Sequence, residues 1–212
     1  MNHVMFDVDG TLVQSMDFDP ELFASAIEEE LDLPVDRNWA QYTNVTDSGI
    51  LDEIIVTHGF NDQKIEIQEK VKSSFISKID EYLKHNPAIE VNGASSFLNQ
   101  LNSVKDINVS IATGGWHETT VLKLKSAGLF FTDIPIASSS DHHSRTEIMK
   151  ISKQRTSSEI DVPCTYFGDA PWDKIACEKL GYNFVLVGSE IIHDQWIPDF
   201  TNHKQALAFI GL

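Results

Sequence analysis

The sequence predicts an α/β fold, an open parallel sheet with a small all-helical unit inserted after the first strand. After Pro87, short apolar segments alternate with helical segments, which is typical of a parallel sheet. Between residues 20 and 83, apolar residues instead recur every three or four positions, without a strand pattern. We therefore expect an α/β core domain formed by residues 1–16 and 89–212, and an inserted α-helical cap domain at residues 17–88.

The core elements follow from short apolar runs and from helix start and stop signals. Strands are expected at residues 3–8, 107–112, 134–138, 164–168 and 184–187. Helices are expected at residues 94–101, 117–127, from 145 onward, and 171–180. Ser144 and Glu147 form a capping-box pattern at the start of the third of these helices. Gly128 and Gly181 follow the ends of two others, where glycine is favoured.

The inserted unit is predicted from three apolar stripes, each on one face of a helix. They are Leu22, Phe23, Ala26 and Ile27; Ile50, Leu51, Ile54 and Ile55; and Val71, Phe75, Ile79 and Leu83.

Composition restricts the partners that the chain is expected to have. The 212 residues include 32 acidic and 16 basic ones, a formal net charge of -16. This excess repels nucleic acid and anionic membranes, and no basic patch interrupts it. No apolar run approaches the ~20 residues that span a bilayer, and the N-terminus lacks the pattern of a secretion signal. We expect a cytoplasmic protein, a monomer or a homodimer, in which Cys164 and Cys177 are buried and reduced.

The polar residues of most interest follow the predicted strands directly. They are Asp7, Asp9, Thr113, Asp169 and Asp173. Ligands of open parallel sheets bind at the carboxyl ends of the strands, so these side chains are expected to meet at one edge. Asp7 and Asp9 would point to one face of a regular strand, and two close carboxylates require a cation or a shared proton. Mg²⁺ fits this requirement, although a solvated Asp-Gly turn is an equally good reading of these residues alone.

The segment DVDGTL at 7–12 resembles the first motif of the haloacid dehalogenase superfamily of phosphatases, DxDGT. The other motifs of this superfamily follow in order along nearly the whole chain. IATGG resembles the second motif and places Thr113 and Gly114 at a phosphate, while GDAPWD at 168–173 resembles the fourth, GDxxxD. The helical insertion resembles the cap of the phosphoglycolate phosphatase and β-phosphoglucomutase branch. The resemblance implies a Rossmann-like core of the haloacid dehalogenase type.

The third motif departs from the pattern of the superfamily, which has a lysine near a helix start. Lys150 and Lys153 lie farther along the predicted helix, so Arg145 is the candidate in this chain. A guanidinium can bind a phosphate through two parallel hydrogen bonds. The alternative is an exposed arginine at the end of a helix.

The resemblance implies a two-step phosphoryl transfer with Asp7 as nucleophile and Asp9 as acid and base. Mg²⁺ would be held by the Asp7 carboxylate, the Asp9 backbone carbonyl and Asp169, with Asp173 acting through water. Thr113, Gly114 and Arg145 would bind the transferring phosphoryl group. The substrate would be a small phosphorylated metabolite under the helical lid, with specificity residues expected in the turn at residues 43–48. The alternative for this turn is a polar loop between two helices that supplies an N-cap.

Three other functions are considered. Dehalogenation is disfavoured because that branch has no use for Asp9, Asp169 and Asp173 together. A sugar phosphomutase would share Asp7, Asp9 and the metal, and it differs in protecting the phosphorylated aspartate from water. A non-catalytic phosphate-binding module, similar to a signalling receiver, is disfavoured by the intact Asp7/Asp9 pair and by the insertion.

Overall fold

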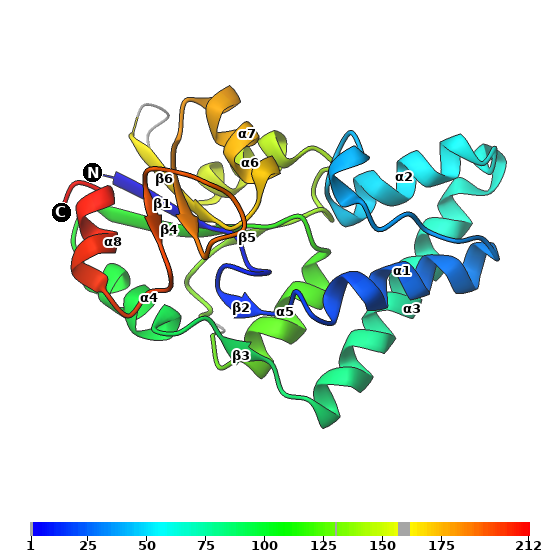
Figure 1. Cartoon of the computed structure of the whole chain (residues 1–212), viewed down its shortest axis with the longest axis horizontal. Helices are drawn as coiled ribbons and strands as arrows, with labels where there is room; N and C mark the ends of the chain where they lie inside the picture. The colour runs from blue at the N-terminus through cyan, green and yellow to red at the C-terminus, as the bar shows by residue number, and fades with distance from the viewer. Residues whose placement is uncertain (1, 130, 157–161) are drawn as a thin grey trace.

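A computed structural model describes residues 2–129, 131–156 and 162–212. Its centre is a six-stranded sheet in the order β5-β4-β1-β6-β7-β8, and every neighbouring pair is parallel. The strands are β1 (Asn2–Phe6), β4 (Ile107–Ala112), β5 (Ile136–Ala137), β6 (Cys164–Gly168), β7 (Asn183–Val187) and β8 (Trp196–Ile197). The predicted α/β fold with an open parallel sheet is confirmed (Figure 1).

Helices pack on both faces of the sheet, as the alternation of β1 side chains requires. Val4 and Phe6 belong to the core shared with α4 (Ala94–Ser103) and α8 (His203–Phe209), whereas Met5 belongs to the core shared with α6 (Arg145–Arg155) and α7 (Pro171–Leu180). The core helices also include α5 (His117–Ser126). Two layers of helices around a parallel sheet bury nearly the full length of its central strands.

The predicted cap range contains three helices and two short 3₁₀ turns. The elements are α1 (Asp19–Leu31), η1 (Trp39–Gln41), α2 (Asp47–Thr57), η2 (Asn61–Gln63) and α3 (Lys64–His85). These helices lie beyond the carboxyl ends of the sheet strands, coloured blue to blue-green in Figure 1. The predicted stripes are their buried faces, for example Val71, Phe75 and Ile79 of α3 at 0% exposure. The division into two domains at 17–88 stays a prediction.

Several short elements were not predicted. β2 (Val13–Gln14) pairs antiparallel with β3 (Ile89–Glu90), so a two-residue ribbon joins the two ends of the helical insertion. Two residues are too few to give a period, which is why these strands, and likewise β8, leave no signal in the sequence. The predicted first strand began one residue too late and ended two residues too late, since β1 spans Asn2–Phe6.

The predicted capping box is wrong, although α6 does begin at Arg145. The Ser144 side chain makes no capping hydrogen bond, and its Oγ lies 3.0 Å from Thr146 Oγ1 instead. Glu147 pairs with Lys150 at 2.8 Å rather than reaching back to the helix start.

Both free cysteines, Cys164 and Cys177, are buried, as expected. None of the helices in the described ranges combines the length and the apolar character that crossing a bilayer requires.

Buried His3 makes the stability of the fold depend on pH. Its side chain is fully buried on β1, where Nε2 lies 2.8 Å from Ser110 Oγ. Burial, with a smaller contribution from Lys153, lowers the pKa of His3 to about 4. Because the unfolded chain binds a proton near pH 6.5 and the folded chain does not, stability from neutral His3 is lost as pH falls below that value. We expect a loss of about 2 kcal/mol between pH 8 and pH 5.

This loss is measured by urea unfolding of the wild type and of His3→Gln across that pH range. The difference in the free energy of unfolding between the two should shrink as pH falls, because glutamine does not titrate. Exposed His58 gives the matched control, and His58→Gln should leave the pH dependence of the wild type unchanged. A constant difference between wild type and His3→Gln would contradict the prediction.

Candidate active site

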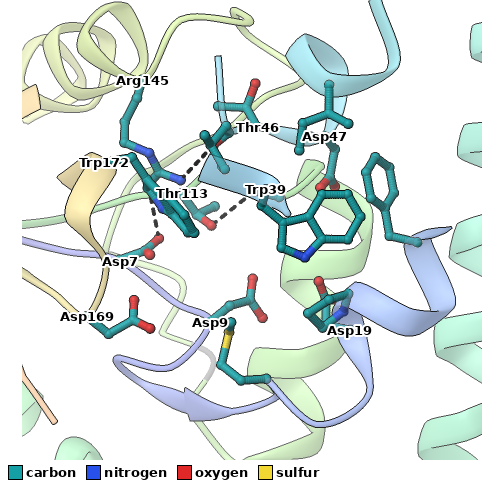
Figure 2. A pocket seen from close by; sticks show the side chains of 17 residues that line it. Asp7, Asp9, Asp19, Trp39, Thr46, Asp47, Thr113, Arg145, Asp169 and Trp172 are labelled. Atoms are coloured by element: carbon teal, nitrogen blue, oxygen red, sulfur yellow. Dashed lines mark hydrogen bonds and ion pairs between the residues drawn. The ribbon is translucent and has the colours of Figure 1, made fainter. Parts of the chain in front are cut away.

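The predicted site residues meet at the carboxyl edge of the three central strands. Asp7 follows β1, Thr113 follows β4 and Asp169 follows β6. They line one cavity of about 90 Å³ between the sheet edge and the helical insertion. Figure 2 shows Asp7, Asp169 and Arg145 on the sheet side of this cavity, with Asp19, Trp39 and Asp47 on the opposite side.

Three carboxylates form an acidic group at the sheet edge, and two of them, Asp7 and Asp169, line the cavity. Asp7, Asp169 and Asp173 are all buried, and one oxygen of each lies within 4.8 Å of the others. Burial, with the charge of Asp173 added, raises the pKa of Asp7 to about 8. Burial and the neighbouring carboxylates Asp173 and Asp7 also raise the pKa of Asp169 well above its usual range. Such a group is electrostatically unfavourable without a cation.

The donor set fits a hard divalent metal ion. Asp7 Oδ1 is buried and has no hydrogen-bond partner, so this oxygen is available as a ligand. Carboxylate oxygens are the protein ligands that Mg²⁺ prefers. Asp173 is less available, because its Oδ1 accepts from Arg145 Nη1 at 2.8 Å and its Oδ2 accepts from the Ala170 amide at 3.2 Å. Its predicted role through a water molecule is compatible with these bonds.

Gly10 is needed for the close approach of the first motif to Asp169. Its φ is +75°, a left-handed conformation that favours glycine. A Cβ at this position would lie 2.2 Å from Asp169 Oδ2. The turn therefore depends on glycine for two reasons, its backbone conformation and the space that it leaves.

Arg145 points into the site from the first position of α6. Its Nη1 lies 2.8 Å from Asp173 Oδ1 and 3.7 Å from Asp7 Oδ1, and its buried Nε has no hydrogen-bond partner. Burial alone would lower its pKa, but Asp173 and Asp7 outweigh burial and raise it. A Cβ on Gly114 would lie 2.4 Å from Arg145 Nη2, so a larger residue in the second motif would displace this guanidinium. The alternative of an exposed helix-terminal arginine is wrong.

Thr113 lies between the acidic group and the start of α5. It is 1% exposed, and its Oγ1 accepts a hydrogen bond from the Gly115 amide at 3.2 Å. Because this bond uses a lone pair, the Thr113 hydroxyl hydrogen can be donated into the cavity.

The predicted specificity turn at residues 43–48 reaches the core at several points. Asp47 accepts a hydrogen bond from the Trp116 amide at 2.7 Å, and its own amide donates to Gly114 O at 2.9 Å. Arg145 Nη2 donates to Val45 O at 3.1 Å, and Thr46 and Ser48 donate to core carbonyls. This turn, with Val45, Thr46 and Asp47 lining the cavity, therefore contacts Gly114 and Arg145, two of the residues predicted to bind phosphate.

Aromatic side chains also line the cavity. Trp172 lines it, together with Phe23 and Trp39 of the insertion. Trp116 does not line it and instead packs against Phe23 at a ring-centroid distance of 5.7 Å.

The sequence did not predict the polar and charged residues that contact Asp9. Ser15 Oγ and Lys123 Nζ each lie 2.5 Å from Asp9 Oδ1, and Lys123 Nζ also lies 2.5 Å from Asp19 Oδ1. Burial raises the pKa of Asp19 to about 6, although Lys123 opposes this effect. One signal of a buried lysine was available in the sequence. Lys123 precedes Leu124 on the face of α5 that buries Thr119 and Thr120.

Comparison with known proteins agrees with this architecture. A model of the family described as "haloacid dehalogenase-like hydrolase" matches residues 4–187, most of the chain. Among curated protein sequences, none matches the chain significantly.

Solved structures resemble the chain over nearly its whole length. A hydrolase from Pseudomonas syringae is 23% identical, with a TM-score of 0.66, over 92% of this chain and 88% of that one. CbbY from Rhodobacter sphaeroides, in complex with phosphate, is 14% identical, with a TM-score of 0.73, over the whole of both chains. A β-phosphoglucomutase from Clostridium difficile is 16% identical, with a TM-score of 0.68, over 97% of this chain and 88% of that one. At these identities the likeness is one of fold.

The family match spans the strands and loops that carry the four motifs, and the fold of the solved structures agrees with it. This chain belongs to the haloacid dehalogenase-like hydrolase family.

Proposed function

We propose that the protein is a Mg²⁺-dependent phosphatase that hydrolyses a small phosphomonoester through a phosphorylated Asp7. The observation that carries the proposal is the surroundings of Asp7. Its Oδ1 has no hydrogen-bond partner, and the Arg145 guanidinium is 3.7 Å away. With a buried cation beside it, this carboxylate is suited to attack phosphorus, because the guanidinium offsets the repulsion between Asp7 and a phosphate.

In the first step an Asp7 carboxylate oxygen attacks phosphorus in line with the leaving oxygen. The bond between phosphorus and that oxygen breaks as the bond to Asp7 forms. Asp9 donates a proton to the leaving oxygen, so the product leaves as an alcohol. Asp9 lines the same cavity as Asp7, on the side that faces the insertion (Figure 2).

In the second step water attacks phosphorus and the bond to Asp7 breaks. Asp9, now a carboxylate, takes a proton from that water. The Asp7 carboxylate is regenerated and free phosphate is released. Arg145, Thr113 and the amides around Gly114 stabilise the charge on the transferring group in both steps. Asp7, Asp169 and the Asp9 backbone carbonyl would hold Mg²⁺, which when bound neutralises charge between nucleophile and phosphate.

The helical insertion supports the choice of a small substrate. The cavity of about 90 Å³ is closed on one side by Trp39 and Phe23 of the insertion, which would exclude a protein chain. Among the solved structures of similar fold, CbbY is in complex with phosphate and another is a β-phosphoglucomutase, which supports a phosphorylated substrate. A sugar phosphomutase remains the second candidate, because it would use Asp7 and Asp9 in the same way.

The test is a phosphate-release assay across phosphosugars, nucleotides and phosphoglycolate, with Mg²⁺ and after chelation by EDTA. We expect activity on at least one compound and a loss of at least about 100-fold without metal, since the acidic group then repels the phosphate. Re-addition of Mg²⁺ should restore the rate. Isomerised sugar phosphate without free phosphate would favour the mutase. No turnover by folded, Mg²⁺-loaded protein across the panel would refute both enzymatic proposals.

A further inference from the structure

Lys123 is fully buried in α5, beside the cavity but not among the residues that line it. A lysine is almost never fully buried unless its ammonium group is paired. Here the ammonium has two carboxylate partners, Asp9 and Asp19, each at 2.5 Å. The two partners come from different parts of the fold, since Asp9 lies in the first motif and Asp19 in the first turn of α1.

The contact with Asp9 distinguishes between the two oxygens of that carboxylate. Lys123 Nζ and Ser15 Oγ both approach Oδ1. Because two donors occupy Oδ1, a proton carried by Asp9 has to be attached to Oδ2. Oδ2 faces the second motif, since a Cβ on Gly115 would lie 3.6 Å from it. The oxygen left free is therefore the one directed toward the loop that, in the proposed function, binds the phosphate.

The contact with Asp19 joins this arrangement to the helical insertion. Asp19 lines the cavity, and α5, the helix that carries Lys123, packs against α3 of the insertion. A single ammonium group thus connects the acid/base carboxylate, a core helix and the first helix of the insertion. A neutral side chain at position 123 would leave Asp9 and Asp19 facing each other without the cation between them.

We propose that Lys123 is a positioning residue, which holds Asp9 through Oδ1 so that Oδ2 exchanges the proton with substrate and water, and which ties that geometry to Asp19 of the insertion. The inference rests on the phosphatase mechanism proposed above. Lys123 touches neither the substrate nor the transferring group and acts only through Asp9.

The test separates the two steps of the reaction in the variant Lys123→Met, loaded with Mg²⁺. With 4-nitrophenyl phosphate and enzyme in excess, release of nitrophenolate reports the first step, for which this leaving group needs no proton. That rate should stay within about 3-fold of wild type, whereas steady-state turnover, in which Asp9 must act as base, should fall about 10- to 100-fold. With an alkyl phosphate the first step should slow by a similar factor. Lys125→Met, at an exposed position of the same helix, should behave as wild type.

A double-mutant cycle with Asp9→Asn tests whether Lys123 acts through Asp9. Once Asp9 is replaced, adding Lys123→Met should cause no further loss of turnover. A purely structural role would instead slow nitrophenolate release and turnover alike and would add to the loss in Asp9→Asn. Equal slowing of the two steps, or an additional loss in the Asp9→Asn background, would overturn the inference. Wild-type turnover in Lys123→Met would overturn it as well. A wild type that releases no phosphate would instead refute the proposed function.

Two further variants keep the test valid if Lys123→Met does not fold. Lys123→Met with Asp19→Asn removes a carboxylate together with its cation, so fewer buried charges remain uncompensated. Asp19→Asn alone retains the buried Lys123 and its contact with Asp9, and asparagine keeps the shape of the Asp19 side chain. Both should slow turnover on 4-nitrophenyl phosphate more than nitrophenolate release, the single variant by a smaller factor. Equal effects on the two steps in these variants would contradict the proposal.

Discussion

Asp7→Asn is expected to abolish turnover, with a fall in kcat of at least about 10⁴-fold, because an amide is a far weaker nucleophile than a carboxylate. The substitution keeps the shape of a side chain that is 4% exposed. It also removes one of three buried carboxylates whose pKa values are raised in the absence of a cation. The metal-free variant should therefore unfold at a urea concentration no lower than that of the wild type.

The measurements are the rate of phosphate release with Mg²⁺ and the urea midpoint without it. Asp62→Asn, at an exposed position of the helical insertion, is the matched control and should retain wild-type activity. Full activity in Asp7→Asn would exclude Asp7 as the nucleophile. Inactivity together with a lower urea midpoint would indicate a folding defect and would contradict the stability part of the prediction.

Arg145→Ala is expected to lower kcat/KM by about 10²- to 10³-fold, as for the loss of a group that stabilises charge on a transferring phosphoryl group. The structural reason is that Arg145 is the cation 3.7 Å from Asp7 Oδ1. Its removal also leaves Asp173 without its 2.8 Å partner. Because the site then carries more uncompensated negative charge, inhibition by inorganic phosphate should weaken by a comparable factor. Arg145→Lys should recover part of the activity, since the charge is kept while the two-pronged hydrogen bonding is lost.

The control for this prediction is Arg155→Ala, in the last turn of the same helix. Arg155 pairs with Asp141 at 2.5 Å, and its side chain is 39% exposed. The variant should keep kcat/KM within about 2-fold of wild type, because an exposed ion pair contributes little. Arg145→Ala with more than half of the wild-type kcat/KM would show that the departure from the lysine of the third motif has no catalytic meaning.

Much of the fold could be predicted from the sequence because its elements are long enough to show a period. The buried stripe of α3 and the strand Ile107–Ala112 are examples, and the latter has the predicted bounds. Turn residues added further information, since Gly128 and Gly181 follow α5 and α7 with positive φ. The ribbon of β2 and β3 could not be predicted, because its pairing joins residues about 75 positions apart through only two residues on each side.

The candidate site was predictable for the residues that follow strands. Asp7, Thr113 and Asp169 were placed at one sheet edge because parallel strands bring their carboxyl ends together. Arg145 was placed by its position at a helix start, and the structure turns its side chain toward Asp7. The sequence by itself thus determined the fold class, the family and the motif residues of the site.

Only the tertiary structure decided how the two parts of the chain meet. Lys123 and Asp19 are 104 positions apart, and no local pattern relates a lysine in one helix to an acid in the first turn of another. The contacts of the 43–48 turn with Gly114 and Trp116 are equally non-local. Buried charges must find partners, but the sequence does not say which ones, because partner choice is fixed by the packing of α5 against the insertion.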